Sequence, residues 1–222
     1  MTQHDGDFVI GGIHVPRFHG QLKQDRLVLE ILDFKQGGYF VEVGAWHPTN
    51  ISNTFILETK FNWSGLCIDP FPVRGFAEKR PGSRLIEAAV GRVDGEVLDF
   101  RMAEWAGGFE KCLSDRAFNR PIVKNADVVS VSTKSLESIL IQNNSPREID
   151  FLSLDTEGSE FEIIRDFDFE KYSFKVIINE HNFIQENRVS VRNLLLSRGY
   201  FLYCELEHDD VYVNKSQRSK NE

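Results

Sequence analysis

The order of apolar segments along this chain of 222 residues predicts an α/β fold, with a mostly parallel sheet and helices on both of its faces. Short apolar runs, each long enough for a buried strand, recur between stretches whose apolar residues follow the period of a helix. This alternation favours parallel strands joined by helices. The last two apolar runs follow each other with no helix between them, which predicts an antiparallel pair at the edge of the sheet.

Strands and helices alternate in the first half of the chain. Apolar side chains recur on one face of a helix over 22–34, and the run YFVEV over 39–43 predicts a strand that ends at Gly44. Residues 53–61 have the pattern of a helix, and the run GLCID over 65–69 predicts the next strand. The elements expected after them are a short helix over 72–79 and strands over 85–90, 97–102 and 128–131.

The second half continues the same alternation. A helix over 133–141 precedes the run FLSL over 151–154, which is apolar apart from one Ser and therefore predicts a buried strand. The last predicted helix ends before Gly199, a residue type that often terminates helices. The other elements expected here are a helix over 159–167, a strand over 175–178, a helix over 189–198 and closing strands over 200–205 and 210–213.

Length and composition suit one domain of ordinary globular type. The hydrophobic fraction is 41% and the charged fraction is 27%. We expect an N-terminal arm or short hairpin over 1–20, a single domain over 21–213 and a flexible polar tail over 214–222. The 26 basic and 34 acidic side chains give a formal charge of −8, which argues against general nucleic-acid binding.

The remaining compositional signals favour a cytoplasmic protein with no membrane span. The three cysteines form no CxxC pair, so neither a zinc knuckle nor a disulfide framework is predicted. The N-terminal segment lacks the apolar core of a signal peptide, and no run of about 18 apolar residues occurs.

Acidic residues stand at the ends of several predicted strands. Glu42 and Gly44 end the first, Asp69 the second, Asp155 the strand over 151–154, and Glu180 the strand over 175–178. Because ligands of open α/β sheets bind beyond the carboxyl ends of the strands, these residues predict a polar binding edge.

The spacing of Gly44 and Asp69 favours a nucleoside ligand. An acidic residue at the end of the second strand can accept hydrogen bonds from both ribose hydroxyls. The full glycine pattern of dinucleotide-binding loops is missing, and the bulky Trp46 leaves little room for a pyrophosphate. S-adenosylmethionine, which has a nucleoside but no phosphate, fits better than a dinucleotide. An oxidoreductase on a dinucleotide fold is the less favoured alternative.

Four segments of the chain resemble the FkbM family of S-adenosylmethionine-dependent methyltransferases. They are FVEVGAWHP over 40–48, SNT over 52–54, WSGLCIDPFP over 63–72 and DFLSLDTEGSE over 150–160. The resemblance implies a class I methyltransferase sheet, which is Rossmann-like, and methyl transfer to the hydroxyl of a sugar, glycan or related natural product. A non-catalytic nucleoside-binding protein of the same fold is an alternative.

The resemblance also implies a role for individual residues. Glu42 would face the amino group of the methionine moiety, Asp69 would bind the ribose, and Asp155 would lie near the sulfonium and the acceptor. The other residues expected at the cofactor are Gly44, Ala45, Asn53, Pro70, Ala88 and Ala89.

A hydroxyl acceptor needs a group that removes its proton. Asp155, His181 and Glu180 are the catalytic candidates, and His181 is included because imidazole titrates near neutral pH. Asp155, Glu157 and Glu180 could together hold a divalent metal, but a metal-free site is favoured. In the loops, Arg116 and Arg120 are candidates to meet an anionic or sugar acceptor. The phenylalanines expected to stack on adenine or a sugar are Phe71, Phe109, Phe118 and Phe183.

Overall fold

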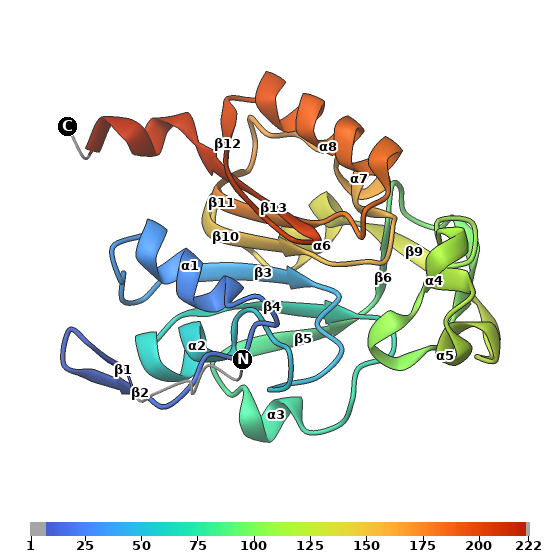
Figure 1. Ribbon diagram of the computed structural model, residues 1–222, viewed down its shortest axis with the longest axis horizontal. Coiled ribbons are helices and arrows are strands. Elements are labelled where there is room, and N and C mark those ends of the chain that lie inside the picture. Colours follow the sequence, from blue (N-terminus) through green and yellow to red (C-terminus); the bar gives the residue numbers. More distant parts are fainter. Residues whose placement is uncertain (1–7, 221–222) are drawn as a thin grey trace.

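A seven-stranded sheet forms the centre of the computed structural model, which describes residues 8–220 (Figure 1). The strands stand in the order β12-β13-β11-β10-β3-β4-β5. Neighbours from β11 to β5 are parallel, whereas β13 runs antiparallel to β11, and β12 runs antiparallel to β13. Their bounds are β3 (Tyr39–Val43), β4 (Ser64–Asp69), β5 (Ser83–Glu87), β10 (Glu148–Leu154), β11 (Ser173–Glu180), β12 (Tyr200–Leu206) and β13 (Asp209–Asn214).

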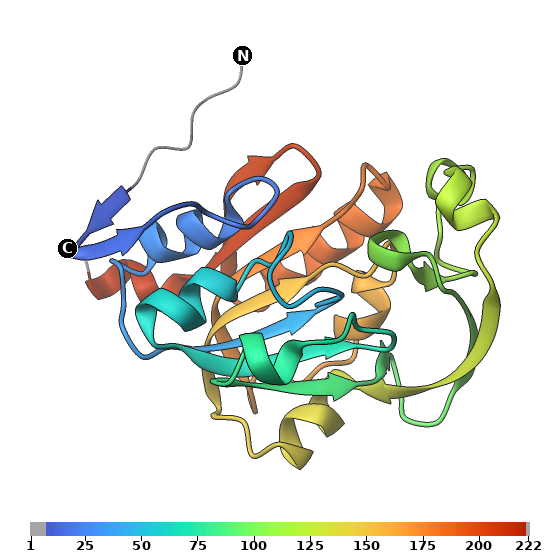
Figure 2. The same cartoon turned by 90° about the horizontal axis from the view of Figure 1, so that it is seen from below.

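Helices cover both faces of this sheet, as the alternation of segments predicts (Figure 2). Successive side chains of a strand point to opposite faces, so Phe40 and Val41 of β3 enter two different apolar clusters. One cluster includes side chains of α6 (Leu136–Gln142), α7 (Glu160–Ile164) and α8 (Gln185–Ser197). The other includes side chains of α1 (Gln24–Ile31), α2 (Phe55–Phe61) and α3 (Phe76–Lys79).

A second, four-stranded sheet is inserted between β5 and β10, in the order β6-β9-β7-β8. With the short helices around it, this insertion lies toward the carboxyl ends of the parallel strands (Figure 1). It comprises β6 (Ala89–Gly91), β7 (Val97–Arg101), the 3-10 helix η1 (Glu104–Ala106), β8 (Gly108–Phe109), α4 (Asp115–Phe118), α5 (Pro121–Lys124) and β9 (Val128–Ser135).

Two predicted elements of this region have different boundaries in the structure. The strand expected over 85–90 is divided at Ala88, since β5 belongs to the main sheet and β6 to the inserted one. The helix expected over 133–141 begins later, because residues 133–135 complete β9. Ser135 then caps α6, its hydroxyl accepting a hydrogen bond from the Ser138 amide.

The chain ends carry small additional elements. A hairpin joins β1 (Phe8–Ile10) to β2 (Ile13–Val15), and a 3-10 helix, η2 (Lys215–Lys220), follows β13. Residues 1–7 and 221–222, where the predicted arm and tail begin and end, lie outside the described residues. Within residues 8–220, no helix is both long and apolar enough to cross a membrane.

Candidate active site

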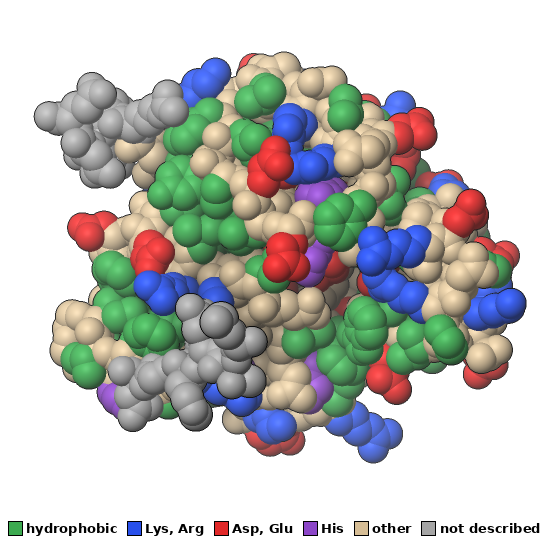
Figure 3. Space-filling view, viewed as in Figure 1, with side chains coloured by type: hydrophobic (Ala, Val, Ile, Leu, Met, Phe, Trp, Pro, Cys, Tyr) green, Lys and Arg blue, Asp and Glu red, His purple; other side chains and the backbone are tan. Residues whose placement is uncertain are grey.

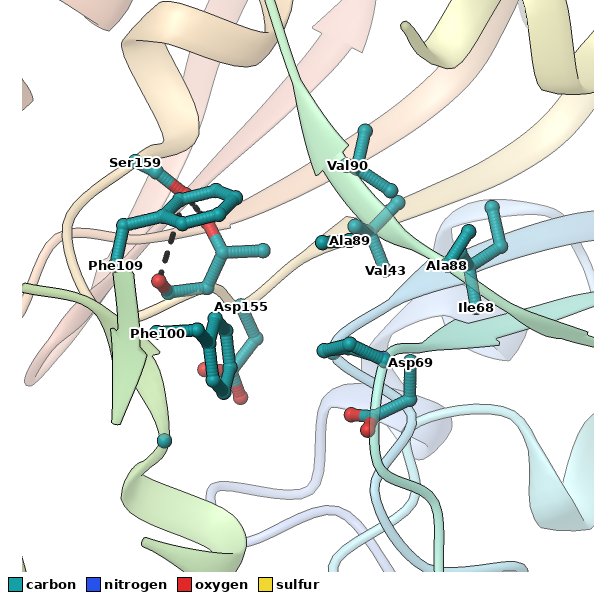
Figure 4. Close-up of a pocket in the computed structure, with 14 residues that line it drawn as sticks. Val43, Ile68, Asp69, Ala88, Ala89, Val90, Phe100, Phe109, Asp155 and Ser159 are labelled. Carbon is teal, nitrogen blue, oxygen red and sulfur yellow. Dashed lines mark hydrogen bonds between the residues drawn. The ribbon is translucent and has the colours of Figure 1, made fainter. Parts of the chain in front are cut away.

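Two adjoining cavities lie at the carboxyl ends of β3, β4 and β10, between the main sheet and the insertion, and Figure 4 shows the first of them. The first cavity is lined by Val43, Gly44, Ile68, Asp69, Pro70, Ala88, Ala89, Val90, Phe100, Gly107, Phe109, Asp155, Thr156 and Ser159. The second cavity is larger and is lined by Gly44, Trp46, Asp69, Phe71, Pro72, Val73, Phe100, Met102, Ala103, Glu104, Trp105, Gly107 and Asp155. The shared residues make the two cavities one continuous site.

Gly44 allows the ends of β3 and β10 to meet. Its φ is +88°, and a Cβ built on it would lie 1.8 Å from the carbonyl oxygen of Asp155. Glycine adopts this left-handed backbone conformation without strain, and it has no Cβ that would overlap the carbonyl oxygen. The Asp155 amide donates to the Val43 carbonyl over 3.1 Å, so this close approach fixes Asp155 at the cavity wall.

Asp69 ends β4 at the junction of the two cavities. Its carboxylate accepts a hydrogen bond from the Trp46 amide over 2.9 Å and one from the Phe71 amide over 2.8 Å. Burial raises the pKa of Asp69 to about 6, although these two hydrogen bonds oppose the shift. Since a carboxylate has about four acceptor positions, two remain for ligand hydroxyls.

Aromatic rings form one wall of the first cavity, and small apolar side chains form the facing wall. The rings of Phe100 and Phe109 lie 5.6 Å apart edge to face, and Phe71 is 5.4 Å from Phe100. Ala88, Ala89 and Val90 lie across from Phe100 and Phe109 (Figure 4). The result is an apolar slot that suits a planar group.

Asp155 is hydrogen-bonded to Glu180, a second carboxyl at the end of the neighbouring strand β11. Two carboxyl groups bond only when one of them keeps its proton. Burial raises the pKa of Asp155 to about 8, and the charges of Glu157 and Asp209 act in the same direction. Burial and the charge of Asp155 likewise hold the pKa of Glu180 well above its ordinary value. The pair therefore retains a proton near neutral pH.

Glu157 links the turn after β10 to the insertion. Its carboxylate accepts hydrogen bonds from Arg120 over 3.0 Å and from the Asn182 amide nitrogen over 2.9 Å. Gly158, at φ +113°, then brings this turn against the insertion, where a Cβ would lie 2.4 Å from the Cys112 carbonyl oxygen. These contacts hold the insertion over the site.

A comparison with protein families identifies the chain. The model of the Methyltransferase FkbM domain matches residues 42–202. The chain belongs to the FkbM methyltransferase family. The matched segment begins in β3, ends in β12 and includes all residues that line the two cavities. No curated protein and no solved structure matches the chain.

Six of the nine predicted cofactor residues line the cavities of this FkbM methyltransferase: Gly44, Asp69, Pro70, Ala88, Ala89 and Asp155. The other three, Glu42, Ala45 and Asn53, are not among the lining residues. Ala45 is buried in the apolar cluster on the α1 side of the sheet. The side-chain amide of Asn53 donates a hydrogen bond to the hydroxyl of Ser153 in β10 over 3.0 Å.

Glu42 belongs to a buried ion-pair network that the sequence did not suggest. Its carboxylate accepts hydrogen bonds from the Asn53 amide over 2.7 Å and from the Thr54 hydroxyl over 2.6 Å. Arg80, only 1% exposed, lies 3.8 Å from Glu42 and 2.6 Å from Glu58. Burial raises the pKa of Glu42, and the charge of Arg80 opposes that shift. The network fixes the loop between β3 and α2. The Glu42 carboxylate, which was predicted to meet the methionine amino group, is therefore already bonded to residues of the protein.

His181 lies apart from both cavities. Its side chain is buried, and Nδ1 accepts a hydrogen bond from the Phe183 amide over 3.0 Å. Burial, helped by the charge of Arg188, lowers the pKa of His181. The nearest carboxylate to Nε2 is that of Asp210, at 3.8 Å. Of the three catalytic candidates, the structure brings Asp155 and Glu180 together and leaves His181 outside the pair.

One group of side chains near the pair could hold a cation. Potential ligand atoms of Glu180, His208 and Asp209 lie within 4.8 Å of one another, and residues 8–220 contain no other group that meets this criterion. The sequence had suggested a different metal-binding group, made of Asp155, Glu157 and Glu180. Only Glu180 belongs to both groups. Asp209 already accepts a hydrogen bond from Gln24 over 2.7 Å.

The insertion supplies site residues that the sequence reasoning missed. Phe100 and Gly107 line both cavities, and Trp105 lines the second. Of the four stacking candidates, Phe71 and Phe109 line a cavity, whereas Phe118 and Phe183 instead lie under the guanidinium groups of Arg101 and Arg116. The two glycines at 107–108 were the available signal, because they mark a turn where backbone can approach a site.

Proposed function

We propose that this FkbM methyltransferase uses S-adenosylmethionine to methylate a hydroxyl group of a sugar, glycan or related natural product. The observation that carries the proposal is Asp69, a carboxylate with free acceptor positions at the junction of an apolar slot and a larger cavity. This is the arrangement that a ribose between an adenine and a second moiety requires.

The charges around the cavities support a cationic cofactor. Three acidic side chains, those of Asp69, Glu104 and Asp155, line the continuous site, and none of its lining residues is Lys, Arg or His. A diphosphate would lose its hydration there without gaining a positive partner, which disfavours a dinucleotide. The slot between Phe100, Phe109 and Ala88 would hold the adenine, and Asp69 would hold the ribose hydroxyls.

When bound, S-adenosylmethionine supplies a methyl group on a positively charged sulfur, which is already activated for transfer. The task left to the protein is to orient the acceptor hydroxyl and to take its proton. We assign the proton to the Asp155–Glu180 pair. The pair holds one proton near neutral pH, so its second, ionised carboxylate would accept the proton of the acceptor hydroxyl, and the raised pKa values make the pair a stronger base than an ordinary carboxylate. His181 is not assigned this role, since it is not among the residues that line the site.

Isothermal titration calorimetry with S-adenosylmethionine and with NAD tests the cofactor. We expect binding of the first and not of the second. Asp69→Asn should weaken S-adenosylmethionine binding by about 10- to 100-fold, the equivalent of a lost hydrogen bond to a charged group. Asp94→Asn is the matched control, because Asp94 also accepts a backbone hydrogen bond, from Ser135, but lies away from the site. Unchanged affinity in Asp69→Asn would remove the ribose assignment.

A further inference from the structure

The second cavity offers two tryptophan rings whose polar edges are free. Trp46 and Trp105 both line it, and Trp105 is 43% exposed. Among residues 8–220, neither indole N–H has an acceptor, whereas that of Trp63 donates to the Lys35 carbonyl over 2.7 Å. A buried or ligand-facing tryptophan normally finds such a partner. Each ring can therefore give a ligand both an apolar face and a hydrogen-bond donor.

Hydrogen-bond acceptors stand beside these rings. Glu104 precedes Trp105 in η1, lines the same cavity, and its carboxylate has no partner among the residues that the structure describes. Asp69 and Asp155 line the cavity as well. A sugar ring has an apolar face of C–H groups and an edge of hydroxyls, so it needs aromatic faces, donors and acceptors in one place.

Basic side chains remain at the rim. Lys and Arg side chains gather next to hydrophobic ones beside α4 and α5 (Figure 3). Arg120 lies 5.4 Å from the ring of Trp105, but its charge is paired with Glu157 at 3.0 Å. Arg116 lies 5.4 Å from the ring of Phe183, and neither arginine lines the cavity. A phosphate or carboxylate on the ligand would thus meet carboxylates without a lining cation.

We infer that the second cavity is the acceptor subsite, in which Trp46 and Trp105 hold a sugar ring that carries neither phosphate nor carboxylate. This inference rests on the proposed methyl transfer and narrows its substrate class. It makes Trp105, contributed by the insertion, a residue that determines acceptor specificity. Arg120, which lies over the ring of Trp105, holds this indole in place.

Saturation-transfer NMR of the full chain tests this assignment, with and without saturating S-adenosylhomocysteine. The probes are methyl glycosides of common hexoses, the matching hexose 6-phosphates and the matching hexuronates. We expect the uncharged glycosides to bind at least about tenfold more tightly than either anionic series. Trp105→Ala should weaken glycoside binding by about tenfold or more. The control is Tyr203→Ala on β12, an aromatic side chain that is 51% exposed and distant from the cavities, and it should change nothing.

Three results would overturn the inference: no binding of any glycoside, equal or tighter binding of an anionic series, or unchanged binding in Trp105→Ala. Calorimetry with S-adenosylhomocysteine distinguishes a failure of the acceptor-subsite inference from a failure of the proposed methyl transfer. Trp105→Ala should retain its affinity for S-adenosylhomocysteine, since the adenine slot and Asp69 are intact. If S-adenosylhomocysteine fails to bind even the unaltered protein, the cofactor proposal fails, and the glycoside titrations in its absence still decide the subsite.

Discussion

Arg80 is the residue whose replacement tests the buried network most directly. Its guanidinium donates to Glu58 over 2.6 Å and to the Thr54 hydroxyl over 2.7 Å, and it lies 3.8 Å from Glu42. Arg80→Met keeps an unbranched side chain of similar length but leaves both buried glutamates without a cation. Removing one partner of a buried ion pair costs about 3–5 kcal/mol. For a chain of this size that corresponds to a fall in melting temperature of about 6–20 °C.

The loss of stability in Arg80→Met should depend on pH in a defined direction. Burial already raises the pKa of Glu42 in the folded state, and without Arg80 that pKa rises further. A group with a raised folded-state pKa contributes stability that is present at low pH and is lost as the pH rises through that pKa. The difference between Arg80→Met and the unaltered protein should therefore be larger at pH 8 than at pH 5.

Urea unfolding followed by circular dichroism at both pH values measures this difference. Arg92→Met is the control, because its ion pair with Asp166 is exposed and should contribute little. Adding Glu42→Gln and Glu58→Gln to Arg80→Met should restore part of the stability, since it removes the unpaired charges. The reasoning is refuted if Arg80→Met costs less than about 1 kcal/mol, or costs the same at pH 5 and pH 8.

Three further predictions concern the site. Folding raises the pKa of Asp155 from 3.8 to about 8, so the stability that its protonated form contributes is lost as the pH rises across that window. The free energy of unfolding should therefore decrease with pH in the unaltered protein. In Asp155→Asn this decrease should be smaller, by up to about 1.4 kcal/mol per pH unit. A slope unchanged in this variant would argue against the retained proton. Gly44→Ala should destabilise the fold well beyond Gly95→Ala in thermal unfolding, because both glycines have positive φ but a Cβ on Gly95 meets nothing within 4 Å. Equal losses would contradict the close approach to Asp155. His181→Ala should lower the melting temperature yet leave the pH profile of methyl transfer in place, and loss of its lower-pH limb would return His181 to consideration as the base.

The sequence was informative where a local pattern carried the information. Strand and helix segments have different apolar periods, so the alternation predicted a mixed α/β fold with helices on both faces. The carboxyl ends of neighbouring parallel strands lie at one edge of a sheet, so Asp69 and Asp155 could be placed together although 86 positions separate them in the chain. The motifs over 40–72 and 150–160 likewise resembled the family to which the chain belongs.

Other features depended on contacts that no local pattern records. Glu42 ends a strand as Asp69 does, yet only the fold brings Arg80 beside it and uses its carboxylate in the interior. His181 follows a strand end, but in the fold its side chain is buried, 3.8 Å from Asp210 of β13.

What the sequence alone determined is therefore the α/β class, the family and the acidic strand ends, since each follows from side-chain period or from residues adjacent in the chain. Only the tertiary structure decided which of those acids line the cavities. It also decided that Phe100 and Trp105 line the cavities, because the chain leaves the main sheet after β5, at Ala88, and the insertion that follows lies over the strand ends. Burial and long-range charge, which set the paired state of Asp155 and Glu180, exist only once the chain has folded.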